Sequence, residues 1–396
     1  MGVAITGMGI ISAIGHSVEE NKTSLMASES GIGPLRHIQT KNSKHIKVGE
    51  ISLSNTQLSK QLQLSEDHSF TRTGLLGLFA AKAALQNANI ITNADHKTGF
   101  ITATTVGGMD MTELFLKQFA TDVDAQKYIQ SHHAGDATQK IADALDITEF
   151  VTTISTACSS AANAIMLGAR MIKAGKLDRV IVGGSDPLSK FTINGFKTLM
   201  IQSDEPCAPF DAHRKGLNLG EAAAYLVLES DEIVQKENKN VLAYLSGYGN
   251  ANDAFHQTAS SENGEGAFLA MQKALKMAGL NPNQIDYVNA HGTATPNNDL
   301  SESVAIQRIF GKNNPDFSST KAFTGHTLAA AGVVEAVFSI ISLQEQTVFP
   351  NLNFKSAIPE TGLIPVTSVV KKELSHVLSN SFGFGGNCST LIFSKA

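Results

Sequence analysis

Cys158 is the residue whose surroundings most clearly suggest covalent chemistry. It lies in Thr-Ala-Cys-Ser-Ser (156–160), between an expected strand at 151–154 and an alanine-rich helix expected over 161–173. A helix N-terminus favours an anion, which lowers the pKa of a thiol and supplies nucleophilic thiolate. Free backbone N–H groups there can also hold an oxyanion. A free cysteine is more often a small buried hydrophobic residue, so this pattern alone leaves both interpretations open.

Two histidines occupy a similar local pattern, each at the end of a strand-like stretch. His291 follows an expected strand at 287–290, and Thr293 and Thr295 behind it add hydroxyl groups suited to amides or a phosphate. His326 lies in Lys-Ala-Phe-Thr-Gly-His-Thr-Leu (321–328), before small residues. Taken alone, each histidine is better explained as a capping or core residue.

Lys321 and Glu335 are the candidate partners of His326. Lys321 precedes the histidine by five residues and Glu335 follows it by nine. A buried lysine needs a charge partner, and Glu335 is the obvious one. The alternative is a surface lysine beside a histidine at a helix start.

The elements that must position these residues read as alternating strands and helices. Strands are expected at 3–6, 98–104, 150–154, 179–182, 223–228 and 287–290, with small-residue helices at 74–86, 161–173, 266–277 and 333–343. This alternation predicts parallel sheets covered by helices. Residues 377–380 and 389–393 instead read as two paired strands. Because ligands of α/β folds bind at the carboxyl ends of strands, the cysteine and both histidines are expected to converge there.

The two sides of the chain begin alike, which suggests a duplicated α/β unit. Residues 3–9 read as a strand running into Gly-Met-Gly, and residues 242–249 as a strand running into Gly-Tyr-Gly. The Gly7-x-Gly9 pair is a poor dinucleotide-binding signature because the third glycine is missing at Ser12.

Composition excludes several classes of protein. The 396 residues are 42% hydrophobic and only 17% charged, which fits a large buried interior in two or three domains. No run of about 18 apolar residues predicts a membrane span. The net charge of −5 and the absence of a basic run give no sign of nucleic-acid binding. The N-terminus is a poor signal peptide, and its formal myristoylation match at Gly2 is better explained as a first buried strand.

The three cysteines, Cys158, Cys207 and Cys388, have no CxxC spacing. A zinc site or a disulfide framework is therefore not expected, and no metal is. A reducing, cytoplasmic location is the default for such a chain.

Five motifs together resemble the elongating β-ketoacyl-acyl-carrier-protein synthases of the thiolase superfamily. They are Thr-Ala-Cys-Ser-Ser (156–160), Pro-Phe-Asp-Ala-His-Arg-Lys-Gly-Leu-Asn-Leu-Gly-Glu (209–221), Asn-Ala-His-Gly-Thr-Ala-Thr-Pro-Asn-Asn-Asp (289–299), Lys-Ala-Phe-Thr-Gly-His-Thr-Leu-Ala-Ala-Ala-Gly (321–332) and Ser-Asn-Ser-Phe-Gly-Phe-Gly-Gly-Asn (379–387). The opening Ile-Thr-Gly-Met-Gly-Ile-Ile-Ser also fits, so the resemblance spans essentially the whole chain.

The resemblance implies a duplicated thiolase-like α/β fold with five layers, αβαβα. Residues 1–235 would form the half that carries Cys158, and residues 236–396 the half that carries both histidines and the gating loops. The chain would act as a homodimer, or as a heterodimer with a homologue resembling a chain-length factor. Its other partner would be an acyl carrier protein, which brings the phosphopantetheine arm. No cofactor would be bound by the chain itself.

The resemblance also assigns roles in a decarboxylative Claisen condensation. Cys158 would carry the growing acyl chain, and His291 and His326 would bind the malonyl thioester carbonyl and stabilise the enolate. The further roles are an oxyanion hole from the backbone N–H groups of Cys158 and Phe384, orientation of His326 by Lys321 with Glu335, contacts of Thr293 and Thr295 with the pantetheine arm, and an acyl-pocket limit at Val106. Two loops would act as gates, one through Asp253 and His256, the other through Phe382 and Phe384.

Departures from the family pattern suggest a specialised pathway. The usual Gly-Gly-Thr-Asn after the gate is Gly-Gly-Asn387-Cys388 here, and Ala208 replaces an arginine expected before Pro-Phe-Asp. Carrier-protein docking on Lys117, Lys127 and Arg72 is expected by analogy alone. An aryl-polyene or polyketide system is favoured over housekeeping fatty-acid synthesis.

The type of third catalytic residue separates this chain from its superfamily relatives. Starter-type condensing enzymes use Cys-His-Asn and degradative thiolases use a second cysteine, whereas the third residue here is His326. Two other functions stay open at this point. One is a cysteine-dependent acyltransferase or hydrolase, which would leave Lys321, His326 and Glu335 without a role. The other is a non-condensing dimer partner, for which Cys158 would be unreactive.

Overall fold

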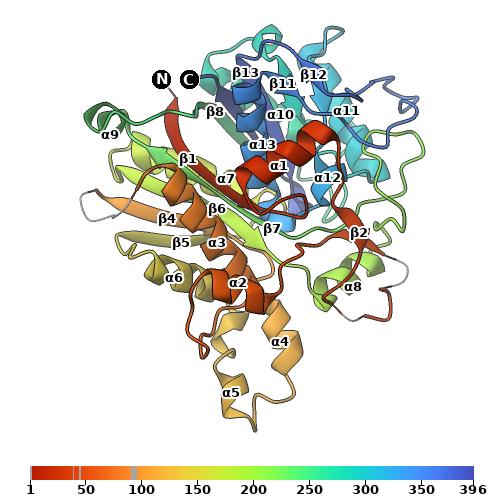
Figure 1. Ribbon diagram of the computed structural model, residues 1–396. Helices are drawn as coiled ribbons and strands as arrows, with labels where there is room; N and C mark the ends of the chain where they lie inside the picture. The colour runs from red at the N-terminus through yellow and green to blue at the C-terminus, as the bar shows by residue number, and fades with distance from the viewer. Residues whose placement is uncertain (1, 39, 44–45, 91–95) are drawn as a thin grey trace.

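The computed structural model describes residues 2–38, 40–43, 46–90 and 96–396 (Figure 1). Within these residues ten strands form one hydrogen-bonded sheet, in the order β10-β9-β13-β14-β8-β1-β7-β6-β4-β5. The first five are β1 (Val3–Ile11), β4 (Thr98–Ala103), β5 (Phe150–Ile154), β6 (Arg179–Asp186) and β7 (Ala222–Glu229). The others are β8 (Ala243–Asn252), β9 (Tyr287–Asn289), β10 (Asp316–Ser318), β13 (His376–Phe382) and β14 (Asn387–Ser394).

The strand order repeats itself. The sheet consists of two sets of five strands that meet at its centre. Read outward from the centre, one set is β1, β7, β6, β4, β5 and the other is β8, β14, β13, β9, β10. In both sets these are the first, fifth, fourth, second and third strands of the set along the chain. Antiparallel pairing of β1 with β8, between residues 3–5 and 243–245, joins the two sets. The repeated strand order agrees with the duplicated α/β unit that the two Gly-x-Gly segments suggested.

The prediction of parallel sheets is only partly correct. In the described part of the chain, β6, β4 and β5 are parallel, as are β13, β9 and β10, but β7 and β14 run antiparallel to both of their neighbours. The predicted pairing of 377–380 with 389–393 is confirmed by the antiparallel ladder of β13 and β14. A buried apolar run gives a strand but carries no information about its direction.

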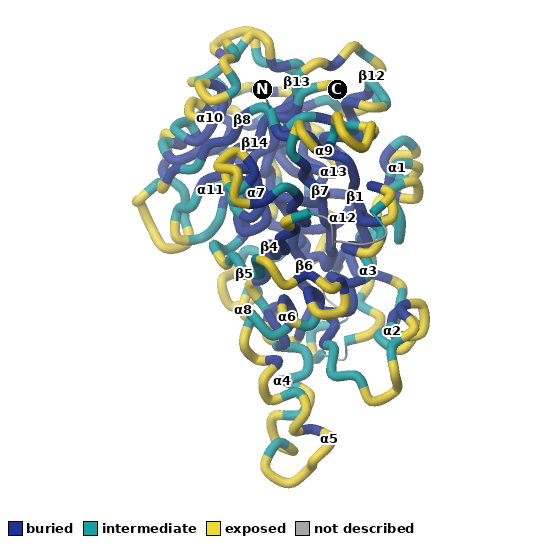
Figure 2. Tube along the Cα trace, turned by 90° about the vertical axis from the view of Figure 1, so that its left-hand side faces the viewer, coloured by how far each residue is buried: buried dark blue, intermediate teal, exposed yellow. Residues whose placement is uncertain are grey.

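The two strand sets form two β layers, and helices lie between them and outside each, which gives the expected five layers. The two central helices, α7 (Ser160–Lys173) and α13 (Ala331–Glu345), contact each other and strands of both sets. The outer layers are α3 (Arg72–Asn87) with α6 (Ala134–Ala144) on one side and α10 (Glu265–Ala278) with α11 (Pro296–Phe310) on the other. Figure 2 shows the strands and central helices buried, with exposed residues gathered on the peripheral helices.

α13 is buried along nearly its whole length, which explains its uniformly apolar sequence. The segment Leu328–Glu345 is long and apolar enough to cross a membrane by composition, yet 89% of it is buried inside the protein. Its apolar residues therefore pack between the two strand sets.

Paired glycines let the outer helices approach the sheet closely. A Cβ at Gly7 or Gly9 in β1 would lie 2.5 or 2.2 Å from carbonyl oxygens of α3. A Cβ at Gly247 or Gly249 in β8 would lie 2.4 or 2.2 Å from the equivalent carbonyls of α10. The Gly-x-Gly segments thus lie inside strands as helix-packing sites, which agrees with the rejection of a dinucleotide loop.

The remaining elements surround this core. The helices are α1 (Val18–Ala27), α2 (Asn55–Gln61), α4 (Met109–Phe115), α5 (Val123–Gln126), α8 (Lys190–Thr198), α9 (Asp231–Lys236) and α12 (Lys321–Thr324). The short segments are β2 (Ile32–Pro34), β3 (Lys47–Gly49), β11 (Thr347–Val348), β12 (Val370–Lys371), η1 (Gln130–His132), η2 (Pro282–Gln284), η3 (Leu328–Ala330) and η4 (Phe384–Gly386). In Figure 1, α4 and α5 project from the body as an arm.

Candidate active site

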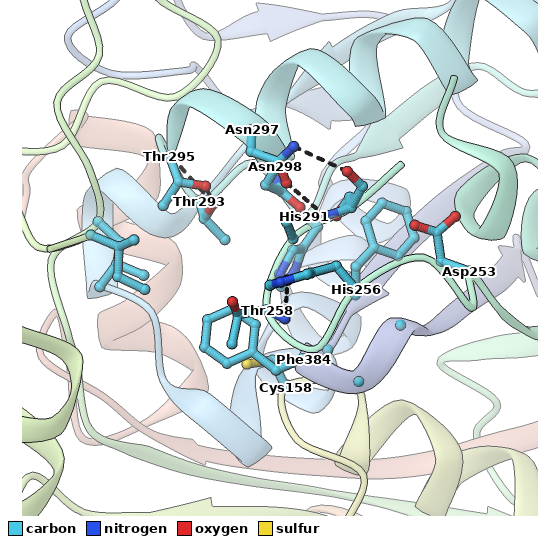
Figure 3. A pocket seen from close by; sticks show the side chains of 18 of the residues that line it. Cys158, Asp253, His256, Thr258, His291, Thr293, Thr295, Asn297, Asn298 and Phe384 are labelled. Atoms are coloured by element: carbon cyan, nitrogen blue, oxygen red, sulfur yellow. Dashed lines mark hydrogen bonds between the residues drawn. The ribbon is translucent and has the colours of Figure 1, made fainter. Parts of the chain in front are cut away.

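Cys158, His291 and His326 line one cavity of about 380 Å³. Cys158 comes from the connection between β5 and α7, His291 from the end of β9, and His326 from the segment between α12 and η3. All three side chains are buried. The sequence prediction that these residues converge at strand ends agrees with this placement, and Figure 3 shows Cys158 and His291 in the same cavity.

A strained turn presents Cys158 to the cavity. Ala157, just before it, adopts a left-handed conformation with φ of 54°, which is uncommon for a residue with a side chain. The backbone N–H of Phe384 donates a hydrogen bond to the Cys158 thiol. Gly383 packs against the same turn, since a Cβ there would lie 2.8 Å from the Thr156 carbonyl oxygen. The turn and the Phe384 segment therefore form one unit.

The expectation of a lowered Cys158 pKa is wrong for the resting protein. Burial raises the pKa of the thiol to about 12, and the Lys321 cation and the Phe384 N–H only partly oppose this effect. Desolvation disfavours the thiolate more than nearby positive groups favour it. The resting residue is therefore a neutral thiol, and its proton must leave during reaction.

Hydrogen bonds fix the position and the tautomer of His291. The backbone N–H groups of His291 and Gly292 donate to the Glu302 carboxylate at 2.9 and 2.8 Å. The Lys321 ammonium donates to His291 Nδ1 at 3.1 Å and to its carbonyl oxygen at 2.6 Å. Because ammonium has no acceptor, Nδ1 must be the unprotonated nitrogen and Nε2 carries the proton.

His326 stands at right angles to His291, with ring centroids 5.4 Å apart. Its backbone N–H donates to the Asn218 carbonyl oxygen at 2.7 Å, whereas its buried Nδ1 has no hydrogen-bond partner among the described residues. Burial and the Lys321 charge hold the pKa of both histidines well below the usual value. The cavity therefore contains two neutral imidazoles.

Lys321 and Glu335 form a buried ion pair behind the histidines. Burial raises the pKa of Glu335 to about 7 against the opposing effect of Lys321. The expected contact of Lys321 with His326 is not found, because the ammonium reaches His291 instead. The short α12 places Lys321 beside the end of β9, and Gly325 with φ of 74° then turns His326 away from it.

Thr293 and Thr295 line the same cavity beyond His291, as Figure 3 shows. Their hydroxyl groups lie 2.9 Å apart and bond to each other. Both oxygens can still accept a hydrogen bond from a ligand amide.

A second cavity of about 390 Å³ also reaches Cys158 and Phe384. Val106 lines it, together with apolar residues of α8 and Leu328. Phe196 of α8 stacks on Phe384, with ring centroids 5.9 Å apart, and both rings face both cavities. Phe384 thus stands between a polar cavity and an apolar one.

The predicted gating residues differ in their surroundings. Asp253 anchors its loop, accepting from the Ser261 N–H and hydroxyl and from the Gly266 N–H. His256 is exposed at the cavity edge. Phe382 is buried in β13 with its ring 5.5 Å from that of His291, so it belongs to the packed wall. Phe384, followed by Gly385 and Gly386 at positive φ, has the mobile setting expected of a gate.

Sequence reasoning missed two buried carboxylates. Glu302 holds the His291 backbone, and Asp186 accepts hydrogen bonds from the Thr105, Val106 and Ala329 N–H groups. Asp186 therefore joins two walls of the apolar cavity. Acidic residues at the end of an otherwise apolar strand, as in Gly-Gly-Ser-Asp (183–186), were the available signal. Phe196 was also missed. The sequence offered no signal for it, because an aromatic residue on a helix most often belongs to the hydrophobic core.

Family models match two stretches that together span most of the chain. The N-terminal domain of beta-ketoacyl synthases matches residues 1–233, and the C-terminal domain matches residues 242–355. The chain belongs to the β-ketoacyl synthase family. The resemblance drawn from the motifs is therefore confirmed.

Individual relatives agree with this assignment over their full length. A 3-oxoacyl-[acyl-carrier-protein] synthase 2 from Staphylococcus aureus is 32% identical, covering 99% of this chain and 98% of its own. The ishigamide ketosynthase/chain length factor structure has a TM-score of 0.93 at 28% identity, covering 100% of this chain and 99% of that one. A Xenorhabdus doucetiae ketosynthase in complex with its chain length factor has a TM-score of 0.88 at 31% identity, covering 100% and 98%.

Proposed function

We propose that this β-ketoacyl synthase joins an acyl group held on Cys158 to a malonyl group held on an acyl carrier protein, releasing CO2 and β-ketoacyl-carrier protein. The observation that carries the proposal is the meeting of one cysteine and two neutral histidines in a cavity with polar as well as apolar lining, which adjoins a more strongly apolar cavity at Cys158. A polar cavity suits a malonyl thioester, and an apolar one suits an alkyl chain.

The first step moves the acyl group to Cys158. The sulfur attacks the thioester carbonyl, the carbonyl–sulfur bond to the carrier breaks, and the carrier thiol leaves. Because His291 Nδ1 accepts from Lys321 and its Nε2 carries the proton, His326 is the imidazole left to accept a proton. We assign it the Cys158 proton, which it passes to the departing thiol.

The second step uses both imidazoles on the malonyl thioester. Nε2–H of His291 and an N–H of His326 donate to the thioester carbonyl oxygen, where negative charge develops as the carboxylate leaves as CO2. Neutral donors suit this step because a protonated histidine would donate its proton to the new carbanion. Thr293 and Thr295 hold the pantetheine arm, which belongs to the carrier protein.

The third step forms the carbon–carbon bond. The carbanion attacks the acyl carbonyl on Cys158, and the backbone N–H groups of Cys158 and Phe384 stabilise the oxyanion. Collapse of this intermediate breaks the carbon–sulfur bond and releases the Cys158 thiolate, which takes up a proton from water to restore the resting thiol. The Phe384 N–H already points at the sulfur, which supports this assignment.

We also propose the division of the chain into halves at residues 1–235 and 236–396. The repeated strand order supports it, since β7 ends at Glu229 and β8 begins at Ala243. In this division one half holds the acyl group and the other activates the malonyl group.

A second ketosynthase-fold chain is the proposed dimer partner, either another copy or a chain-length-factor-like homologue. β5 is an edge strand with every residue half-buried. Phe191 and Leu199 line the apolar cavity although they are 63% and 44% exposed, so one chain leaves that wall incomplete. The solved relative with its chain length factor supports the heterodimer alternative.

The carrier-protein docking residues need revision. Arg72 is buried and paired with Glu221, so it is not a docking residue. Lys127 is exposed over the Tyr128 ring, but Glu66, Asp67 and Asp124 line the same hollow. We retain Lys117 and Lys127 as docking candidates. Carrier-protein binding should weaken as salt rises to physiological strength if they act by charge.

The pathway is proposed as fatty-acid or specialised aryl-polyene or polyketide synthesis. A cytoplasmic location fits the three free cysteines.

Intact-mass analysis with acyl- and malonyl-carrier protein tests the function directly. We expect acylation of Cys158, followed by CO2 release and condensed product. Cys158→Gln should abolish condensation, by on the order of 10⁴-fold or more, and still release CO2 from malonyl-carrier protein. Acylation without condensed product would favour the acyltransferase or hydrolase alternative. No acylation at all would favour the non-condensing partner.

A further inference from the structure

A group of three asparagines lies beside the nucleophile turn, and the mechanism above gives it no role. Asn163 comes from α7, Asn250 from β8 and Asn387 from the start of β14. Together with Ser159 they form what we call the asparagine cluster. It joins the two halves of the chain directly behind Cys158.

Asn387 is the centre of this cluster. Its Oδ1 atom accepts from Ser159 Oγ at 2.7 Å, from Asn163 Nδ2 at 2.9 Å and from Asn250 Nδ2 at 2.9 Å. An amide carbonyl oxygen can accept several donors, and the Ser159 hydroxyl shares its one proton between Asn387 Oδ1 and the Thr156 carbonyl oxygen, which also lies at 2.7 Å. The Asn387 side chain is half-buried, and hydrogen bonds that are shielded from water can fix the relative positions of the groups they join.

Each of the three donors either belongs to the nucleophile turn or bonds to a residue that contacts it. Ser159 directly follows Cys158 in sequence. Asn163 uses its other amide proton on Thr156 Oγ1, at 2.8 Å, two residues before Cys158. Asn250 also donates to Asn163 Oδ1 at 3.0 Å. Asn387 is therefore bonded to the turn directly at Ser159 and, through Asn163, at Thr156.

Asn387 is also the residue at which the Phe384 gate ends. Gly385 and Gly386, at φ of 82° and 80°, precede it and allow rotation that other residues resist. The Gly383 N–H donates to the Asn387 carbonyl oxygen at 2.8 Å, which closes the segment into a loop. The gate thus begins and ends on points held against the Cys158 turn.

We propose that Asn387 is a positioning residue that fixes the end of the Phe384 gate to the Cys158 turn. The Phe384 ring can then move to admit a substrate while the acyl-bearing sulfur and the two ends of the gate, Gly383 and Asn387, stay in place and return the Phe384 N–H to the sulfur. This inference rests on the proposed condensation. Its consequence is coupling, because each carbanion formed at the histidines meets a correctly placed acyl group.

The test is the ratio of CO2 released to β-ketoacyl product formed, measured with acylated enzyme and malonyl-carrier protein. Wild-type enzyme should give a ratio near one. Asn387→Leu, similar in size but without the acceptor, should raise the ratio to about three or more, with the rate of CO2 release within about twofold. Asn387→Asp, which keeps an oxygen for all donors, should return it close to one. Asn313→Leu makes the same change at an exposed turn and should leave it at one.

The outcomes separate the two proposals. Wild-type enzyme that gives neither CO2 nor product overturns the proposed function. A coupled wild type with an equally coupled, folded Asn387→Leu variant overturns the role of Asn387, as does an Asn387→Asp variant as uncoupled as Asn387→Leu. If Asn387→Leu fails to fold, Ser159→Ala removes one donor, and an unchanged ratio in that variant also overturns the role.

Discussion

The two halves of the chain share a scaffold but differ in the side chains placed at the ends of equivalent strands. β5 and β10 are the third strands of their sets, and they lead to Cys158 and to Lys321 with His326. β4 and β9 are the second strands, and they lead to Val106 and to His291. The duplicated fold therefore brings four strand ends to one place with different side chains on each.

In the proposed mechanism, this difference assigns one substrate to each half. The N-terminal half supplies the nucleophile and most of the apolar cavity, whereas the C-terminal half supplies both imidazoles and most of the cavity around them. The long β4–β5 connection of the N-terminal half, with α4, α5 and α6, stands where the C-terminal half has only α11. An acyl chain binds to an apolar surface that encloses it, whereas a malonyl thioester binds to hydrogen-bond donors.

The strongest loss of activity should come from removing a donor of the C-terminal half. His291→Ala should lower CO2 release and condensation by about 10²–10³-fold, because one donor to the developing enolate is lost. Acylation of Cys158, followed by intact mass, should stay within a few-fold of wild type. If acylation fell as far as CO2 release, the separation of the two halves by substrate would be wrong.

Removing the cation behind His291 should change the pH dependence. Burial is the main reason that the His291 pKa lies well below 6.5, and the Lys321 charge adds to it, so Lys321→Met should raise that pKa part of the way back and protonate the imidazole at higher pH. A protonated His291 quenches the carbanion. We therefore expect the condensation rate at pH 6 to fall a few-fold relative to pH 8, with more acetyl-carrier protein formed.

A control for that variant neutralises the whole pair. Lys321→Met combined with Glu335→Gln avoids leaving an unpaired buried carboxylate. Its pH profile should match that of the single variant. A profile that returned to wild type would assign the shift to Glu335.

Filling the apolar cavity tests the N-terminal half. Val106→Phe should lower kcat/KM for long acyl donors about tenfold or more relative to acetyl, because the larger ring occupies space used by the chain. CO2 release from malonyl-carrier protein should be unaffected. Equal losses for short and long donors would place the acyl chain elsewhere.

The mildest changes concern the scaffold that both halves share. Gly9→Ala and Gly249→Ala should each destabilise the protein by about 1–3 kcal/mol, since each Cβ would meet a helix carbonyl. Gly33→Ala is the control, because no atom lies within 4 Å of its Cβ position. Melting temperatures measure all three. A clear difference between the first two would show that the halves differ in packing as well as in chemistry.

The sequence predicted the parts of the protein that local patterns encode. The strand at 150–154, the helix at 161–173 and the convergence of Cys158 with the histidines followed from apolar runs and small residues. The reversed direction of β7 and β14 did not, because strand direction depends on distant connections. The raised pKa of Cys158 was not predicted either. The prediction considered only the helix N-terminus, whereas desolvation depends on how the whole protein packs around the thiol. The contact of Lys321 with His291 required the turn at Gly325.

Asp186 has a consequence for how this enzyme can diversify. One carboxylate accepts hydrogen bonds from the backbone of residues 105–106 and of Ala329, so two parts of the apolar cavity wall share a single anchor. A change on one wall is transmitted to the other, and substitutions at Val106 and Leu328 should be epistatic. Lineages that acquire new chain lengths would then be expected to alter both positions together while Asp186 itself stays invariant.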